Sequence, residues 1–320
     1  MTSLTELKQT IRKSRPGIRE TSLNLYANNA NKLAKLYHKD SAPIASLQFL
    51  KDTSTVTEII SQKKPNTQKT YLASIVVVLM AFDGDQELIK HYRTLMEQIA
   101  NDQNLVSKKQ LKSESQVANW STVKELRAEL NRQRKAIVKR KLWTKSQLTA
   151  KEFEMIQKYV VGSLYLADDA NPPLRSDYGG MKLICGKDYG ALPDGDRKRN
   201  YLVIRSRNRK LFHLGDYKTA KTYGEKQIKV GSTLNTILNK WLKVNKHGTL
   251  LVNKIKKPMT PNQLTKYMPK VFEATGKKIG ISLLRHIYIS EKFPAQLQEK
   301  EATADLMAHS VKTQADYSKK

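Results

Sequence analysis

Arg285 lies in a sequence context that requires an anion. It belongs to Ile281-Ser-Leu-Leu-Arg285-His286-Ile-Tyr-Ile-Ser290, whose apolar spacing predicts a helix. We expect an arginine on such a helix to be partly buried, and a partly buried guanidinium needs a negative partner. That partner is either a protein carboxylate or a ligand phosphate. A guanidinium can bind either kind of anion through two parallel hydrogen bonds, which a lysine cannot do.

The composition also indicates a polyanionic partner. The 320 residues include 58 Lys and Arg against 29 Asp and Glu, which gives a formal net charge of +29 and a pI near 10.0. This balance argues against the surface of an ordinary metabolic enzyme and favours nucleic acid, most simply double-stranded DNA, as the partner. The single cysteine, Cys185, excludes a disulfide scaffold within the chain and a cysteine-rich zinc module.

Several well-known catalytic motifs are missing from the sequence. It contains no G-x-x-x-x-G-K-[ST], G-x-G-x-x-G, H-E-x-x-H or G-x-S-x-G motif. The six histidines are scattered, without partners at metal-ligand spacing. We therefore expect neither a cofactor nor a metal, although a metal-dependent nuclease stays open because its carboxylates need not be close in sequence.

The C-terminal quarter resembles the tyrosine recombinases, the phage-integrase-like family. In that family an H-x-x-R box precedes an L-G-H-S box, which is followed by a nucleophilic tyrosine. Here Ser282-Leu-Leu-Arg285 stands at the first box, Leu306-Met-Ala-His309-Ser310 at the second, and Tyr317 follows. The sequence Leu284-Arg-His-Ile-Tyr is also similar to recombinases of large eukaryotic DNA viruses and related mobile elements.

Two upstream segments extend the resemblance to roughly residues 119–317. Pro173-Leu-Arg175-Ser-Asp177 resembles the first arginine box of the family, where a carboxylate follows the arginine closely. Residues 220–230 resemble the hairpin that presents the catalytic lysine between two strands, here Lys221. Each box alone is a weak signal, whereas five in the family order are moderately specific.

The resemblance implies a role for each of five residues. Arg175 and Arg285 would bind the scissile phosphate, and His309 would donate a further hydrogen bond to it. Tyr317 would attack the phosphorus and form a 3′-phosphotyrosine, while Lys221 would protonate the leaving 5′ oxygen. Religation then needs neither metal nor ATP, because the bond energy is kept in the adduct.

The sequence departs from the family pattern at three places. Ser282 replaces the histidine of the H-x-x-R box, and His286 would compensate only from the same helix face, which adjacent residues do not share. The spacing from His309 to Tyr317 is one residue shorter than is common in the family. The sequence stops three residues after Tyr317, so either the subunit contact differs from that of longer relatives or the sequence is cut short.

Each site residue also has a plain structural interpretation. Arg175 is explained in isolation by a helix cap or an exposed surface position, and Tyr317 by a loosely packed terminal aromatic. His309 is explained by capping of the preceding helix. Lys218 competes with Lys221 as the general acid. Taken in order, the five residues favour the functional interpretation. By contrast, we expect His213 and Cys185 to be strand residues without a function.

The resemblance predicts a site-specific DNA recombinase or integrase that acts as a homotetramer through a four-way junction. One alternative is a type IB topoisomerase, which would relax any supercoiled plasmid without a specific site. Another is a non-catalytic DNA-binding protein derived from a recombinase, which would bind DNA with steep salt dependence but form no adduct. No membrane span or export signal is visible, so we expect an intracellular protein in a compartment that holds DNA, such as the nucleus, nucleoid or a viral compartment.

The predicted fold is mainly α with a small antiparallel β-sheet. We expect a basic, flexible arm over 1–15, a helical DNA-clamping domain over 16–105, a linker over 106–118 and a catalytic domain over 119–320. Short apolar runs predict strands at 181–185, 201–204, 211–214 and 227–230. Helices are expected at 21–39, 65–82, 87–100, 149–166, 233–246, 261–275, 282–291 and 296–307.

A strongly basic stretch over residues 120–141 is the predicted DNA-contacting surface of the catalytic domain. A charge run is usually a solvated face, but the net charge of +29 makes phosphate tracking about as good an explanation. The DNA-binding residues predicted here are Lys124, Arg127, Arg132, Arg134, Lys135, Lys139 and Arg140.

Overall fold

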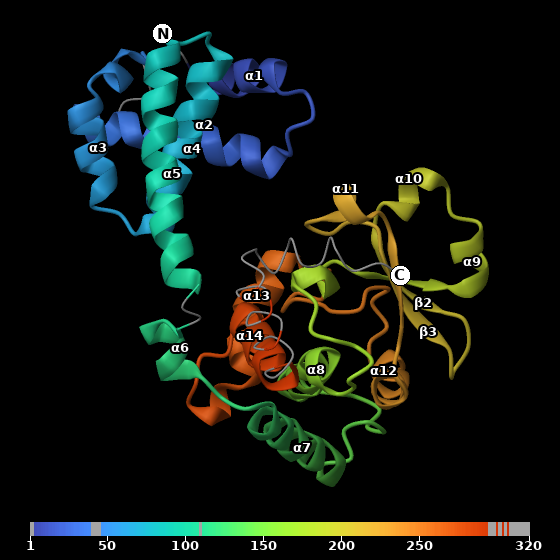
Figure 1. Cartoon of the computed structure of the whole chain (residues 1–320). Coiled ribbons are helices and arrows are strands. Elements are labelled where there is room, and N and C mark those ends of the chain that lie inside the picture. The colour runs from blue at the N-terminus through green and yellow to red at the C-terminus, as the bar shows by residue number, and fades with distance from the viewer. Residues whose placement is uncertain are drawn as a thin grey trace. The chain divides into compact units, whose positions relative to one another are not determined.

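The computed structural model divides the chain into two compact units, residues 1–111 and 112–320 (Figure 1). It describes residues 3–39, 46–108 and 111–293, together with 299, 303 and 306. Most of the helix predicted over 296–307 lies outside these residues. His309 and Tyr317 also lie outside them.

Unit 1, residues 1–111, is helical throughout its described part. Helix α4 is the most apolar, and its buried residues Ile75, Val78 and Leu79 pack against the neighbouring helices. The predicted helices at 21–39 and 65–82 are confirmed, and the one predicted at 87–100 extends further in both directions. Its elements are α1 (Leu4–Ser14), α2 (Glu20–His38), η1 (Gln48–Lys51), α3 (Thr53–Ser61), α4 (Pro65–Ala81) and α5 (Gln86–Lys108).

The N-terminal segment is a packed helix, so the prediction of a flexible arm over 1–15 is wrong. Ser3 and Glu6 form a capping box that begins α1. Leu7 and Ile11 lie one helical turn apart and are fully buried against α2 and α4. Leu4 packs beside them, so α1 has an apolar stripe at helical spacing that fixes it against the rest of unit 1.

Unit 2, residues 112–320, combines helices with one small sheet. Helices make up 63% of the described residues and strands 7%, which confirms the prediction of a mainly α fold with a small sheet. Its larger helices are α7 (Val123–Lys139), α8 (Ala150–Leu166), α12 (Ser232–Val244), α13 (Pro261–Val271) and α14 (Ile281–Lys292). Its shorter ones are α6 (Glu114–Asn119), η2 (Ser176–Tyr178), α9 (Gly186–Gly190), α10 (Asp194–Arg197), α11 (Ala220–Tyr223) and η3 (Glu273–Thr275).

The predicted linker is shorter than expected at its C-terminal end. Residues 114–119 form α6, which begins with a capping box at Ser113 and Gln116. The side-chain oxygen of Asn119 accepts a hydrogen bond from the backbone N–H of Lys278 at 2.7 Å. Helix α6 therefore belongs to unit 2, and the division between the units falls at residue 111.

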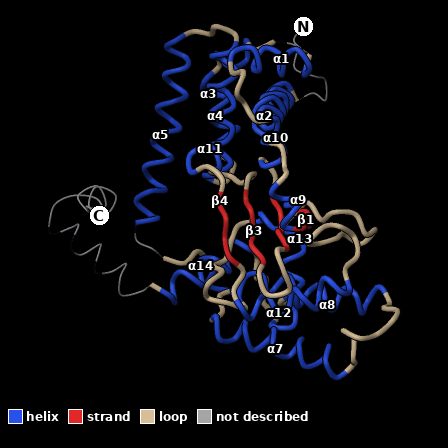
Figure 2. The backbone as a smooth tube through the Cα atoms, turned by 90° about the vertical axis from the view of Figure 1, so that its right-hand side faces the viewer, coloured by secondary structure: helices blue, strands red, loops and turns tan. Residues whose placement is uncertain are grey.

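The sheet is mixed, so the prediction of a wholly antiparallel sheet is wrong. Its strands β1 (Lys182–Cys185), β2 (Asn200–Ile204), β3 (Lys210–Leu214) and β4 (Lys226–Lys229) lie side by side in chain order (Figure 2). The β1–β2 pair is parallel, while β2–β3 and β3–β4 are antiparallel. A parallel pair needs a crossover connection, and here α9 and α10 lie in it.

The sheet separates a large core from a small one. Leu202 and Phe212 belong to the large core, which also contains buried residues of α7, α8, α12, α13 and α14. Tyr201 and Val203 point to the opposite face and pack with Tyr189 of α9. This alternation is the period-two pattern of a strand. Functional groups are more often carried by the loops at the ends of such a sheet than by its strands.

Within the described residues, no helix is long and apolar enough to cross a membrane.

Candidate active site

Two arginines from distant parts of the sequence lie near one carboxylate in unit 2. Arg175 precedes η2, Asp177 lies within it, and Arg285 lies on α14. The charges of both arginines act on Asp177 and favour its ionised form. The structure therefore brings together the two arginines that the sequence predicted to share a phosphate.

The backbone around Arg175 is fixed by two buried tyrosines. The Tyr165 hydroxyl of α8 donates to the carbonyl oxygen of Arg175 at 2.9 Å, and the Tyr178 hydroxyl donates to that of Leu164 at 3.1 Å. The two rings meet edge to face with centroids 5.3 Å apart. These contacts hold the segment after Pro172-Pro173 against α8, while the Arg175 side chain stays exposed.

Helix α14 presents Arg285 at the edge of the large core. Ile281, Leu284 and Ile287 are buried, and Arg285 beside them is half-buried. Its Nε donates to the carbonyl oxygen of Pro173 at 3.2 Å. This bond uses one of the five N–H donors of the guanidinium. Helix α14 and the segment before Arg175 are thus linked directly.

Ser282 of the H-x-x-R box and His286, which follows the box, lie on the exposed side of α14. Ser282 and His286 are both exposed, one turn apart, whereas Arg285 is half-buried. As the helical spacing predicted, His286 does not share the face of Arg285. Arg285 is therefore the residue of this box that lies beside Arg175 and Asp177.

Burial raises the pKa of Asp177 above its usual value, since desolvation penalises the charged form. The backbone N–H of Arg175 and the charges of Arg175 and Arg285 oppose this effect. The same burial raises the pKa of Tyr165 well above its usual range, with Asp177 adding to the rise and Arg285 opposing it. Asp177 thus feels the charge of both guanidinium groups, while no ion pair with either one is formed within the described residues.

The candidate general acids lie in the connection between β3 and β4. Lys221 lies on the short helix α11 and Lys218 precedes it, and both side chains are exposed. The Tyr217 hydroxyl donates to the carbonyl oxygen of Gly224 at 2.7 Å, which closes this connection into a compact loop. Gly224 has a φ of 65°, a conformation that favours glycine.

Asn200 joins this lysine-bearing connection to the arginine segment. Its Nδ2 donates to the carbonyl oxygens of Asp177 at 3.1 Å and Asp216 at 2.8 Å. Its Oδ1 accepts from the backbone N–H of Asp216 at 2.9 Å. One side chain at the start of β2 therefore holds both segments. No motif in the sequence pointed to Asn200.

The remaining predicted catalytic residues, His309 and Tyr317, lie outside the described residues. In the part of the chain that the structure describes, no group of three or more His, Cys, Asp or Glu side chains is placed to hold a metal ion.

The basic helix α7 is partly neutralised by protein partners. Three of the predicted DNA-binding residues have acidic partners: Arg127 pairs with Asp169 at 2.5 Å, Arg132 with Glu129, and Arg140, directly after the helix, with Glu152. Arg134 donates to the side-chain oxygen of Asn131, a neutral partner that does not offset its charge. Lys124, Lys135 and Lys139 are exposed and have no acidic partner within the described ranges. The helix thus offers fewer unpaired cations than its sequence indicates.

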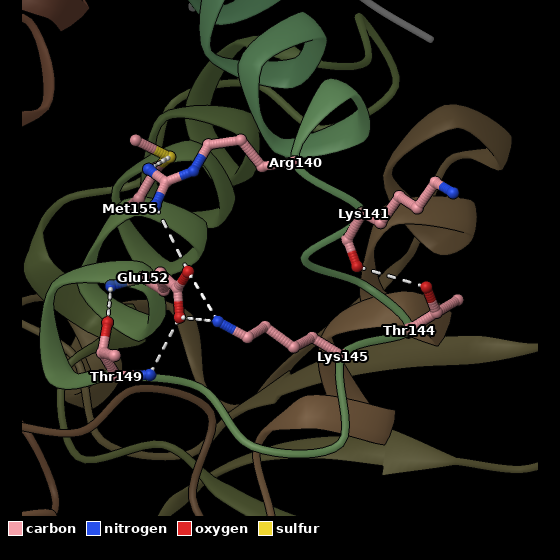
Figure 3. Close-up of polar contacts among 7 residues, drawn as sticks. All are labelled: Arg140, Lys141, Thr144, Lys145, Thr149, Glu152 and Met155. Carbon is pink, nitrogen blue, oxygen red and sulfur yellow. Dashed lines mark hydrogen bonds and ion pairs between the residues drawn. The ribbon is translucent and has the colours of Figure 1, made fainter.

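Glu152 is the clearest of these partners (Figure 3). Its carboxylate accepts hydrogen bonds from the backbone N–H of Thr149 at 3.0 Å, from the Nζ of Lys145 at 2.9 Å and from the guanidinium of Arg140 at 3.2 Å. The Thr149 N–H and then Lys145 lower the pKa of Glu152 to about 2. Glu152 is also the capping-box residue that begins α8, so Arg140 acts here as a structural residue.

His213 and Cys185 occupy strands, as expected. His213 is fully buried, with its Nε2 at 2.7 Å from the carbonyl oxygen of Arg197 and its Nδ1 at 3.0 Å from the Tyr189 hydroxyl. Both ring nitrogens are thus satisfied by the fold. Cys185 is a free, exposed thiol at the end of β1.

Comparisons with known proteins add no relative to this picture. The chain matches no protein-family model, and neither the curated proteins nor the solved structures contain a significant match to it.

Proposed function

We propose that this chain is a tyrosine recombinase that cleaves and rejoins DNA strands through a covalent 3′-phosphotyrosine. The observation that carries the proposal is the position of Arg175 and Arg285. They come from segments about a hundred residues apart, yet both act on Asp177 and are joined through the Pro173 carbonyl. The lysine-bearing connection is tied to the same segment through Asn200.

Each residue has one step in the proposed reaction. The Tyr317 hydroxyl gives its proton to solvent water and attacks the phosphorus, which forms the tyrosyl–phosphate bond and breaks the bond to the 5′ oxygen. Arg175, Arg285 and His309 donate hydrogen bonds to the non-bridging oxygens as negative charge develops there. Lys221 gives a proton to the leaving 5′ oxygen, and Lys218 is its rival for this role. Attack by a 5′ hydroxyl reverses these steps and releases the tyrosine.

The proposal includes the wider assembly. Unit 1 would clamp the DNA, and recombination would take place in a homotetramer on double-stranded DNA, in a compartment that holds DNA. The net charge of +29 supports a nucleic-acid partner. The integration or excision of a viral or mobile element is the setting in which such a reaction is used.

Covalent trapping tests this function. The wild-type protein and the Tyr317→Phe variant are mixed with labelled duplex DNA that carries the sequences flanking the gene, in EDTA, and then denatured in SDS. We expect a slowly migrating protein–DNA adduct with the wild-type protein only. Binding in a gel-shift assay should be equal for the two proteins, because the substitution removes one hydroxyl.

Three outcomes would contradict the proposal in different ways. An adduct that persists in Tyr317→Phe would overturn the choice of nucleophile. Tight binding without any adduct would favour a non-catalytic DNA-binding protein. Relaxation of every supercoiled plasmid, without a preferred site, would favour topoisomerase activity.

A further inference from the structure

A second basic site lies at the turn between β2 and β3, beside α12. A groove of about 340 Å³ is lined there by Arg207, Asn208, Asn235, Thr236, Asn239, Lys240 and Lys243. Among these described lining residues three are cations and none is acidic. Arg205 and Arg209 belong to the same exposed turn and have no acidic partner within the described ranges. We call this site the basic groove.

A buried lysine lies behind the basic groove. Lys210 is 5% exposed, and its Nζ donates to the carbonyl oxygen of Arg207 at 2.8 Å, to Asn235 Oδ1 at 2.9 Å and to Asn239 Oδ1 at 2.6 Å. No carboxylate pairs with it in the described part of the chain. Burial lowers the pKa of Lys210. A buried cation is normally paired with an anion, so this ammonium lacks its usual counter-charge.

The lysine also determines which atoms the groove presents. Because Lys210 only donates, Asn235 and Asn239 must turn their oxygens toward it. Asn235 then uses its Nδ2 to bind the carbonyl oxygen of Arg207 at 3.1 Å. The Nδ2 of Asn239 has no hydrogen-bond partner among the described residues. The turn is thus tied to α12, and the groove offers an amide N–H, a guanidinium and two ammonium groups.

This set of groups fits an oxygen-rich anion. Phosphates of a nucleic-acid backbone accept hydrogen bonds from Arg, Lys and Asn side chains, and such contacts position a protein on DNA without reading its sequence. Lys240 and Lys243 lie one turn apart on the exposed side of α12, so they can meet neighbouring phosphates of one strand. The ligand phosphate would also supply the negative charge that Lys210 lacks.

We propose that the basic groove binds the backbone of double-stranded DNA. The assignment to DNA, rather than to another polyphosphate, rests on the proposed function. The groove lies at the end of the β2–β3 hairpin, whereas the lysine-bearing β3–β4 connection lies at the other end of β3. It would therefore hold DNA outside the segment that contains the scissile phosphate.

Salt-dependent DNA binding by the full chain tests the basic groove. The groove variant carries Arg207→Gln, Lys240→Gln and Lys243→Gln. The control variant carries Lys254→Gln, Lys257→Gln and Lys266→Gln, three exposed lysines without an ion-pair partner in the described part of the chain. Both lower the net charge by three. Binding to a labelled duplex is measured between about 50 and 200 mM salt, a range over which backbone contacts change affinity strongly.

We expect the groove variant to flatten the plot of log K against log salt by about 0.9 for each phosphate that the protein no longer neutralises, so by roughly 2 to 3. The control variant should change the slope by less than about 1. Equal slopes for the two variants would overturn the proposal. It would also be overturned if the groove variant bound duplex RNA more weakly than the wild type but bound duplex DNA equally well. Should the triple variant fail to fold, Lys240→Gln alone, on the exposed side of α12, should flatten the slope by about 0.9.

This binding test is separate from the test of catalysis. Tyr317 has no part in it, so an absent adduct together with a flattened slope would reject the recombinase but retain the groove. An adduct together with unchanged slopes would retain the recombinase but reject the basic groove.

Discussion

Arg285 makes one bond to the protein and leaves most of its donors for a ligand. Its Nε bonds the Pro173 carbonyl, and no other hydrogen bond or ion pair of this side chain occurs within the described residues. The two terminal nitrogens can then bind a phosphate as a fork. The charge of Arg285 also acts on the half-buried carboxyl group of Asp177. Binding of this kind depends on the planar fork of the guanidinium as well as on its charge, and a substitution that keeps only the charge measures the difference.

Replacement of Arg285 by lysine should therefore be nearly as harmful as its removal. Lys keeps the charge but not the planar fork, so we expect Arg285→Lys and Arg285→Ala each to lower the rate of DNA cleavage at least ~100-fold. The rate is measured as adduct formation in a single turnover. Ile289→Ala, an exposed change on the same helix, serves as the control. A near-wild-type rate for Arg285→Lys would show that charge alone is sufficient.

The two candidate general acids can be distinguished by the leaving group. A 5′-thiolate leaves without a proton, so a DNA substrate with a 5′-bridging sulfur should restore cleavage only to the variant that lacks the proton donor. We expect rescue of Lys221→Ala and none of Lys218→Ala. Single-turnover cleavage of the two substrates measures the effect. The reverse pattern would assign the role to Lys218, which lies in the same exposed connection.

At the scale of elements, helix α8 depends on the charge of Glu152. A carboxyl whose pKa is lowered by folding stabilises the protein above its unfolded pKa, and this contribution is lost as the pH falls through the folded value. The pKa of Glu152 falls from 4.5 to about 2, so its contribution is complete above pH 4.5 and disappears toward pH 2. We expect Glu152→Gln to lower the Tm at pH 7, with a difference from wild type that shrinks between pH 4.5 and pH 2.

Thermal unfolding followed by circular dichroism at several pH values measures this difference. Glu154→Gln is the matched control, because it lies on the same helix without an ion-pair partner in the described part of the chain. A difference that stays constant with pH would mean that Glu152 acts through its shape rather than its charge.

The elements that sequence reasoning found are those with a complete local signal. Helix α8 has its capping box and apolar spacing in one stretch, and it forms as predicted. The direction of β1 was missed because a four-residue apolar run does not encode which way a strand pairs. Helix α1 is an exception, because its capping box at Ser3 and Glu6 and its apolar residues at helical spacing are visible in the sequence, while its many polar and basic residues favoured a flexible arm.

Sequence reasoning also found some residues of the candidate site and missed others. The order of short motifs predicted that Arg175 and Arg285 would meet, because family boxes mark side chains that act together. It did not predict Asn200, whose role depends on two backbone carbonyls brought near it by the fold. The basic groove was also missed, although the run Arg205-Ser-Arg-Asn-Arg-Lys210 was a visible signal, because the lysines of α12 join it only in three dimensions.

At the scale of the whole molecule, two separate cores carry the fold. The buried clusters of unit 1 are built from residues between Leu7 and Tyr92, and those of unit 2 from residues between Leu126 and Ile287. Each unit thus buries its own apolar surface, which is the condition for folding as a domain. Such a molecule should lose its two cores in separate steps.

Calorimetry of the full chain with one cavity in each core tests this separation. Leu72 of α4 and Leu238 of α12 are both almost fully buried, so each change to alanine should cost roughly 2–5 kcal/mol. We expect two unfolding transitions, with Leu72→Ala lowering the Tm of one and Leu238→Ala lowering that of the other. Leu36→Ala, at an exposed position of α2, should move neither. A single transition shifted equally by both core variants would show instead that the units unfold as one.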